Sequence, residues 1–170
     1  EQKFDIIECV GVLHHMEDPM EGWMKLKDLL IPGGLMKIGL YSELARKPIV
    51  QLRKEIQGSK VGATDDAMKL FRHDLIQSNS ETFKKISLFD DFYNLNELRD
   101  LLFHVQEHRF TLTQIKKCLS KLDLTFCGFE TNHLLQEYKT KNPEADDCYD
   151  LDEWQVFEEQ NESLFSGMYQ

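Results

Sequence analysis

Residues 4–42 constrain the fold most, because they read in succession as a strand, a helix and a second strand. The short apolar run at residues 4–10 is too short and too rich in β-branched side chains for a helix. It predicts a strand buried on both faces, as is usual in a parallel sheet. After a polar loop, apolar residues recur at the spacing of an amphipathic helix: Met20, Trp23, Leu26 and Leu30.

The sequence also predicts where this helix begins and ends. Asp18 is suited to cap its first turn, and Pro19 is suited to its first position. The Pro32-Gly33-Gly34 run is expected to end it, and a second strand is expected at residues 35–41. The three elements predict one β-α-β unit, with its strands parallel and side by side and with a right-handed crossover.

These residues resemble the middle of a class I S-adenosylmethionine-dependent methyltransferase. The resemblance rests on F-D-x-I, V-L-H-H-M-E-D-P, the amphipathic helix and L-x-P-G-G, which follow one another in this order. In that family they would be the fourth strand, its helix and the fifth strand. The segment D-L-L-F-H-V-Q-E-H-R-F-T at residues 100–111, with the helix and apolar stretch that follow, resembles the rear of such enzymes, including relatives joined to tetratricopeptide repeats.

The resemblance implies an α/β fold: the C-terminal half of a Rossmann-like methyltransferase sheet with a mostly helical insert. The glycine-rich loop of the family and the acidic residue that ends its second strand would lie upstream, and no G-x-G-x-G occurs here. These two features hold the cofactor, by a logic similar to that of dinucleotide sites. We therefore expect a partial domain that binds S-adenosylmethionine poorly or not at all.

The rest of the chain divides into a helical insert at residues 43–108, expected to lie over the strand ends, and a mixed segment at residues 109–170. Within the insert, Thr64, Ser80 and Asn94 are placed to begin helices. The mixed segment predicts, in order, a helix at 111–122, a strand at 124–129, a helix at 131–138, a last helical face and a final strand beginning within 165–169. By the resemblance, that final strand would lie antiparallel between the fifth and the sixth.

Charge and composition exclude several classes of function. The formal net charge is −10 and no block of lysine and arginine occurs, which argues against a nucleic-acid substrate. No apolar run approaches about 18 residues, so no membrane span is expected. The four cysteines lack C-x-x-C spacing, and reduced thiols in a cytoplasmic protein are the simplest interpretation.

The resemblance implies that Cys9, Val10 and Gly11 contact the cofactor at the end of the first strand. Gly11 would permit a close approach of the backbone. An equally simple interpretation makes Cys9 and Val10 ordinary buried strand residues.

His14 and His15 follow in the loop, and adjacent residues on a strand could not grip one metal ion together. The resemblance places His14 near the cofactor, and an imidazole there would suit removal of a proton from the methyl acceptor. The alternative is a loop histidine that caps the helix or meets solvent, which we favour for His15.

Residues 104–108 spell H-x-x-E-H. On a helix, His104 and His108 would share one face and could bind zinc with Glu107 as the base of an inverted zinc peptidase, although a downstream glutamate would have to supply the third ligand. Nothing around the motif resembles a peptidase, and Arg109-Phe110-Thr111 leads directly into a new helix start. No metal is therefore predicted.

The favoured interpretation places His104, Gln106, Glu107 and His108 over the methyl-acceptor pocket, where they would orient the acceptor or take its proton. Tyr41, at the end of the second strand, would line the rim of the same pocket. Each has a structural alternative: His104 as a half-buried core residue, Glu107 as the surface partner of Arg109, and Tyr41 as strand packing.

The predicted function is thus methyl transfer from S-adenosylmethionine to a small-molecule or protein acceptor, with catalysis mainly by alignment of donor and acceptor. The alternative is a non-catalytic interaction module. In either case, an exposed sheet edge could pair two copies into a homodimer.

Overall fold

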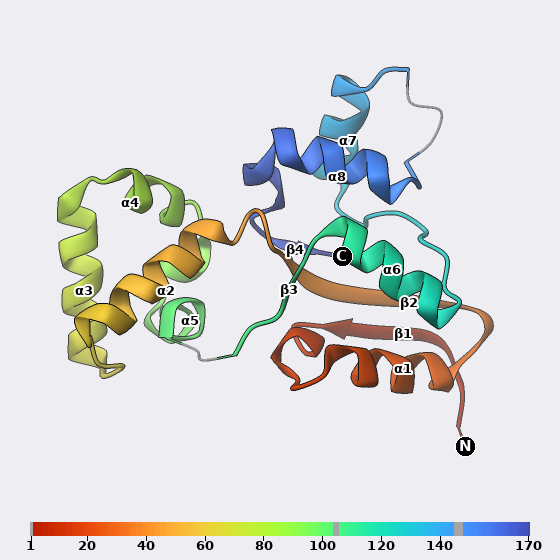
Figure 1. Cartoon of the computed structure of the whole chain (residues 1–170), viewed down its shortest axis with the longest axis horizontal. Helices are drawn as coiled ribbons and strands as arrows, with labels where there is room; N and C mark the ends of the chain where they lie inside the picture. Colours follow the sequence, from red (N-terminus) through yellow and green to blue (C-terminus); the bar gives the residue numbers. More distant parts are fainter. Residues whose placement is uncertain (1, 104–105, 145–147) are drawn as a thin grey trace. The chain divides into compact units, whose positions relative to one another are not determined.

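The computed structural model describes residues 2–103, 106–144 and 148–170 (Figure 1). The chain divides into two compact units, an α/β unit formed by Glu1–Ala45 with Glu107–Gln170, and a helical unit formed by Arg46–Gln106. Each unit has a core of its own. The fold is therefore mixed α/β, with a small sheet confined to the first unit.

The predicted β-α-β unit is present at the start of the chain. Strand β1 (Phe4–Val10) and strand β2 (Leu30–Ser42) are parallel neighbours, joined by helix α1 (Pro19–Leu29). Asp18 caps α1, because its Oδ1 accepts hydrogen bonds from the amides of Met20 at 2.8 Å and Glu21 at 3.3 Å. The pairing confirms that the two strands expected within residues 4–42 are parallel neighbours.

The boundary between α1 and β2 differs from the prediction. The helix ends at Leu29, and the Pro32-Gly33-Gly34 run lies inside β2 instead of ending the helix. The pairing shifts there, because Phe4 faces Leu30 whereas Ile6 faces Leu35. Gly33 supplies a positive φ of 77°, which non-glycine residues avoid, and so lets β2 take up the additional residues.

Two short strands complete the sheet at the carboxyl end of β2. Strand β3 (Arg109–Phe110) pairs with β2 in parallel, with Tyr41 facing Arg109 and Ser42 facing Phe110. Strand β4 (Met168–Tyr169) pairs with β2 antiparallel, with Leu40 facing Tyr169. A final antiparallel strand beside β2 agrees in part with the expectation for residues 165–169, because the sixth strand expected on its other side, at residues 124–129, does not form.

One face of the sheet is covered and the other is bare. Cys9 and Leu40 belong to a core that also contains Trp23 of α1 and two residues of α6, Leu112 and Ile115.

On the opposite face, the side chains of Ile6 and Leu35 are 70% and 59% exposed, and the edge residue Phe4 is 39% exposed. The prediction that β1 is buried on both faces is therefore wrong. On this second face, Phe4, Ile6 and Glu8 of β1 are exposed, whereas Val10 at its carboxyl end is half-buried.

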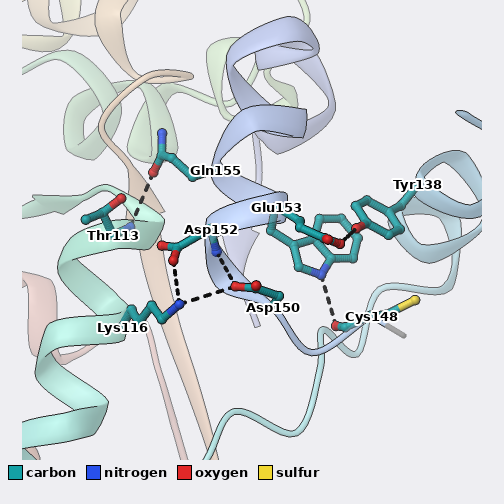
Figure 2. A network of polar contacts seen from close by, with 9 residues as sticks. Thr113, Lys116, Tyr138, Cys148, Asp150, Asp152, Glu153 and Gln155 are labelled. Atoms are coloured by element: carbon teal, nitrogen blue, oxygen red, sulfur yellow. Dashed lines mark hydrogen bonds and ion pairs between the residues drawn. The ribbon is translucent and has the colours of Figure 1, made fainter. Parts of the chain in front are cut away.

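In the described residues, three α-helices lie between β3 and β4 in the sequence: α6 (Leu112–Leu122), α7 (Asn132–Lys141) and α8 (Leu151–Gln160). Thr111 and Gln114 form a capping box at the start of α6. Figure 2 shows how α8 is attached to its neighbours: Gln155 accepts a hydrogen bond from Thr113 N, and Lys116 contacts the carboxylates of Asp150 and Asp152.

The centre of this region is Trp154, which is fully buried in α8. Its ring stacks on Tyr138 of α7 with the ring centroids 4.1 Å apart, and it meets Phe129 edge to face at 4.9 Å. The indole N–H donates to the carbonyl of Cys148 at 3.0 Å, so the polar atom of this buried side chain is satisfied (Figure 2).

Residues 124–129, predicted as a strand, have no regular secondary structure. Their burial still alternates in the manner of a strand, and Phe129 is buried while Cys127, expected in the apolar strand, is exposed. One hydrogen bond, from Glu130 N to Gln170 O at 2.9 Å, joins the end of this segment to the residue after β4. The apolar pattern was therefore read correctly, but a strand also needs a paired neighbour.

The helical unit contains the expected run of helices. The elements are α2 (Lys47–Ser59), α3 (Asp65–Ser78), α4 (Glu81–Ile86), the 3₁₀ turn η2 (Asp90–Phe92), α5 (Leu95–Leu98) and a π-helical turn η3 (Arg99–Phe103). Thr64, Ser80 and Asn94 cap α3, α4 and α5 with their side chains, as predicted.

The core of the helical unit is apolar and includes Ile49, Met68, Phe92 and Leu98, none of which is exposed. Arginine side chains also bind backbone carbonyl groups of its outer turns. Arg53 donates to the carbonyl of Leu101 at 2.9 Å, and Arg72 donates to that of Tyr93 at 2.9 Å. Guanidinium groups thus satisfy carbonyls that short helices leave open.

None of the helices among the described residues combines the length and the apolar character needed to cross a bilayer.

Candidate functional site

The carboxyl ends of β1 and β2 bring together residues that are far apart in the sequence. After β1, Gly11 turns the chain with a φ of 76°, and the 3₁₀ turn η1 (Leu13–His15) follows. Segment 107–110 passes beside this turn, because the amide of His108 donates to the carbonyl of His14 at 2.8 Å. Open α/β sheets bind their ligands at this edge.

His14 lies at the centre of this cluster. Its side chain is fully buried, and its ring centroid is 4.4 Å from that of Tyr41 at the end of β2. His15, by contrast, is exposed, which agrees with the structural interpretation favoured for it. The ring of His15 stands 4.2 Å from that of His14 in an edge-to-face arrangement.

Glu107 is buried as well. Only 3% of its side chain is exposed, and its Oε1 is 3.8 Å from Nη1 of Arg109, which also donates to the carbonyl of Glu107 at 3.1 Å. The alternative of a solvated pair on the surface is therefore wrong for Glu107. A buried carboxylate needs a charged or hydrogen-bonding partner, and Arg109 supplies one.

The H-x-x-E-H motif does not form the helix that a zinc peptidase requires. The π-helical turn ends at Phe103, residues 106–108 are irregular, and β3 begins at Arg109. His104 lies outside the described residues. Across residues 2–103, 106–144 and 148–170, no three histidine, cysteine, aspartate or glutamate side chains gather as metal ligands do.

The remaining predicted residues fall into two groups. Cys9 is buried in the core, and this burial raises the pKa of its thiol, which agrees with the alternative of an ordinary buried strand residue. Val10 is half-buried beside it. Gln106 is exposed and belongs to the helical unit, so it is not placed with the cluster.

Gly11 has the geometry of a close-approach position. A Cβ added there would have the Cε of Met168 as its nearest neighbour, at 4.0 Å, so the space above the residue is open. The positive φ and the open space together are the features expected of a backbone that a ligand approaches.

A second polar cluster adjoins the first and was not predicted. Ser42, at the end of β2, and Tyr169, in β4, both donate hydrogen bonds to the carboxyl of Glu158 in α8. A signal was present in the sequence: Glu158 is seven residues after Leu151 and four after Trp154, so it shares their apolar helix face.

A large hollow in the α/β unit lies elsewhere. It has a volume of about 1090 Å³ and is lined by residues of β2 and α6 and by segment 123–130. The described residues that line it include none of His14, Tyr41, Glu107 and His108. We place the candidate site at the strand ends, because chemically competent side chains converge there.

Comparison with known proteins yields little on function. No protein-family model matches the sequence. A protein of Synechococcus sp. described as uncharacterized is 30% identical to the chain over 168 residues, which is 91% of this chain. The chain spans 40% of the length of that relative.

Proposed function

We propose that the chain forms the C-terminal part of an S-adenosylmethionine-dependent methyltransferase domain. The observation that carries the proposal is the convergence of Gly11, His14, Tyr41 and His108 at the carboxyl ends of two parallel strands. The antiparallel β4 beside β2 adds support, because it agrees with the strand arrangement that the sequence resemblance implies.

The residues present fit one wall of a cofactor site. Gly11 would meet the cofactor with its backbone, because no side chain fills the space above it. When bound, S-adenosylmethionine supplies a methyl group on a sulfonium centre. The role of the chain is then to align the acceptor with that methyl group and to exclude water, which can supply much of the rate enhancement.

His14 and His108 are the proposed proton acceptors. A neutral imidazole titrates near neutral pH and can take the proton that a hydroxyl or amine acceptor loses on methylation. Tyr41 holds the ring of His14 by direct contact, and Glu107 with Arg109 holds the segment that carries His108. Their proposed role is therefore to position the two imidazoles.

The bare face of the sheet supports the proposal of a partial domain. Parallel sheets are almost always covered on both faces, yet Ile6 and Leu35 stand largely exposed. We propose that further polypeptide of the same protein covers this face and supplies the glycine-rich loop. Coding sequence directly upstream of Glu1 should then contain an in-frame G-x-G-x-G segment.

Calorimetric titration with S-adenosylmethionine tests the cofactor site. The 170-residue chain should give no measurable binding, whereas a version extended by the upstream coding sequence should bind. In the extended version, Gly11→Val should abolish binding. Gly33→Val is the matched control, because Gly33 has nearly the same φ of 77° but lies at the opposite end of β2.

Two results would contradict the proposal. Tight binding by the 170-residue chain alone would show that the cofactor site needs no residues beyond this chain. Equal loss of binding in the Gly11 and Gly33 variants would show that backbone strain, and not the strand-end position, is responsible.

A second candidate function, an interaction module, is favoured by the same bare face. Ile6 and Leu35 face each other across β1 and β2 and form an apolar surface beside the unpaired edge of β1. Sedimentation velocity tests this alternative. Dimers that form as the concentration rises would favour it, if the double change Ile6→Ser with Leu35→Ser abolishes them. The control Leu70→Ser, on the exposed surface of α3, should leave these dimers intact.

A further inference from the structure

Glu158 is a fully buried carboxyl that links three elements of the α/β unit. It lies in α8, and the hydroxyl of Tyr169 in β4 is 2.6 Å from each of its carboxyl oxygens. The hydroxyl of Ser42, at the end of β2, donates to Oε1. Ser42 Oγ in turn accepts from the amide of Ala45 at 2.9 Å.

The surroundings of this carboxyl disfavour a negative charge. Glu159 and Glu162 repel it from α8 and the turn that follows, while Glu43 adjoins Ser42 at the end of β2 and acts on Tyr169. Burial is the largest influence and raises the pKa of Glu158, and the hydrogen bonds from Ser42 and Tyr169 oppose it only in part. Burial and the charge of Glu158 also raise the pKa of Tyr169, which therefore stays a hydrogen-bond donor.

We propose that Glu158 is a proton-dependent fastener that holds the C-terminal strand β4 and the end of β2 together. In its neutral form the carboxyl accepts from the hydroxyls of Ser42 and Tyr169, and the cluster carries no charge. Loss of the proton to solvent leaves a buried carboxylate among acidic neighbours. The cluster then opens more readily, because only an opened cluster lets water solvate the charge.

The direction of the pH dependence follows from linkage. Opening exposes Glu158 to water and returns it to the ordinary pKa of a glutamate, which is lower than the value it has in the closed cluster. The closed cluster is therefore fully stabilised below the ordinary pKa. This contribution is lost as the pH rises through the raised value.

The Glu158 cluster is connected to the candidate site through Tyr41. This residue precedes Ser42 and pairs with Met168, the neighbour of Tyr169, so opening would free one side of Tyr41. Control of the acceptor pocket by this route rests on the proposed function, whereas the fastening itself does not.

Amide hydrogen exchange of β4 and of residues 40–42, corrected for the intrinsic effect of pH, tests the proposal in the full chain. Protection should fall as the pH rises above the ordinary pKa of a glutamate, by about tenfold for each unit by which the pKa of Glu158 is raised. In Glu158→Gln, which keeps a hydrogen-bonding group but cannot ionise, protection should not depend on pH. The matched control Glu159→Gln removes an exposed, repelling charge one residue away but keeps an ionisable Glu158, so protection should still fall with rising pH, by a smaller total amount than in the wild type.

Titration of the Glu158 carboxyl carbon by NMR in the wild-type protein gives an independent test that does not require the variant to fold. It should titrate above the ordinary pKa of a glutamate. Titration at that ordinary value, or the same pH dependence of exchange in wild type and Glu158→Gln, would overturn the proposal. Neither measurement uses S-adenosylmethionine, so failure of the methyltransferase assignment would leave both results interpretable.

Discussion

Gly39 is a point of very close approach between the two parallel strands. A Cβ added there would lie 2.7 Å from Cγ1 and 3.1 Å from Cα of Val10, its partner in β1. The strands can keep their separation only if this position has no side chain.

Gly39→Ala should therefore destabilise the α/β unit by about 1–3 kcal/mol, the usual cost of forcing atoms into a packed site. Urea unfolding followed by tryptophan fluorescence measures this, because Trp23 and Trp154 both belong to that unit. Gly167→Ala is the control, since a Cβ there meets nothing within 4 Å. Equal effects of the two changes would contradict the steric argument.

At the same scale, the sequence allows the identity of some site residues to be predicted, but not their burial. His14 and Tyr41 are both placed correctly at strand ends, because strand boundaries follow from the apolar pattern. That their rings touch, and that Glu107 is buried, depends on where segment 107–110 returns to the sheet. More than sixty residues separate the end of β2 from this segment, and no local sequence pattern predicts that the two meet.

The start of α6 shows how one side chain can complete a helix end. Beyond the capping box, Oε1 of Gln155 in α8 accepts from the amide of Leu112 at 2.9 Å and from that of Thr113 at 3.3 Å, and Figure 2 shows the contact with Thr113. These amides belong to the first turn, which has no partners within the helix.

Gln155→Ala should lower the stability of the α/β unit by about 1 kcal/mol, because two amides lose their acceptor in a half-buried place. Tryptophan-detected unfolding in urea measures the change. Glu159→Ala is the matched control, since it removes the contact of Gln155 Nε2 with Glu159 Oε1 at 3.1 Å but leaves the two amides their acceptor. A loss in the control as large as that in Gln155→Ala would contradict a capping role.

Elements whose signals are local were predictable, whereas those that depend on a neighbour were not. Caps at Asp18, Thr64 and Thr111 were identified because each side chain bonds to amides two or three residues away. Segment 124–129 has the apolar alternation of a strand but no partner strand. The periodicity of a sequence indicates which face of an element is apolar. The pairing of strands, in contrast, depends on which segments meet in the folded sheet.

For the whole molecule, the two units have separate apolar cores, and this predicts separate unfolding. Met68 is fully buried in the helical unit and Leu40 is 2% exposed in the α/β unit. Met68→Ala should cost the helical unit about 2–5 kcal/mol, with little change in tryptophan-detected unfolding.

Leu40→Ala is the reciprocal variant and should shift the tryptophan signal by a similar amount. Helical circular dichroism, recorded in the same urea series, reports both units and should resolve two transitions in one or both variants. Coincident shifts by both probes in both variants would show instead that the cores unfold as one cooperative unit.

The helical unit leaves and re-enters the sheet at positions that are held in register. Tyr41 faces Arg109, Ser42 faces Phe110, and the amide of Glu43 donates to the carbonyl of Phe110 at 2.9 Å. Both ends of the insert are therefore anchored by the same few backbone bonds, whatever lies between them. Lengthening or shortening of the chain within residues 46–106 leaves those bonds intact, so homologous proteins should differ in length mainly there, where evolution can exchange one module for another.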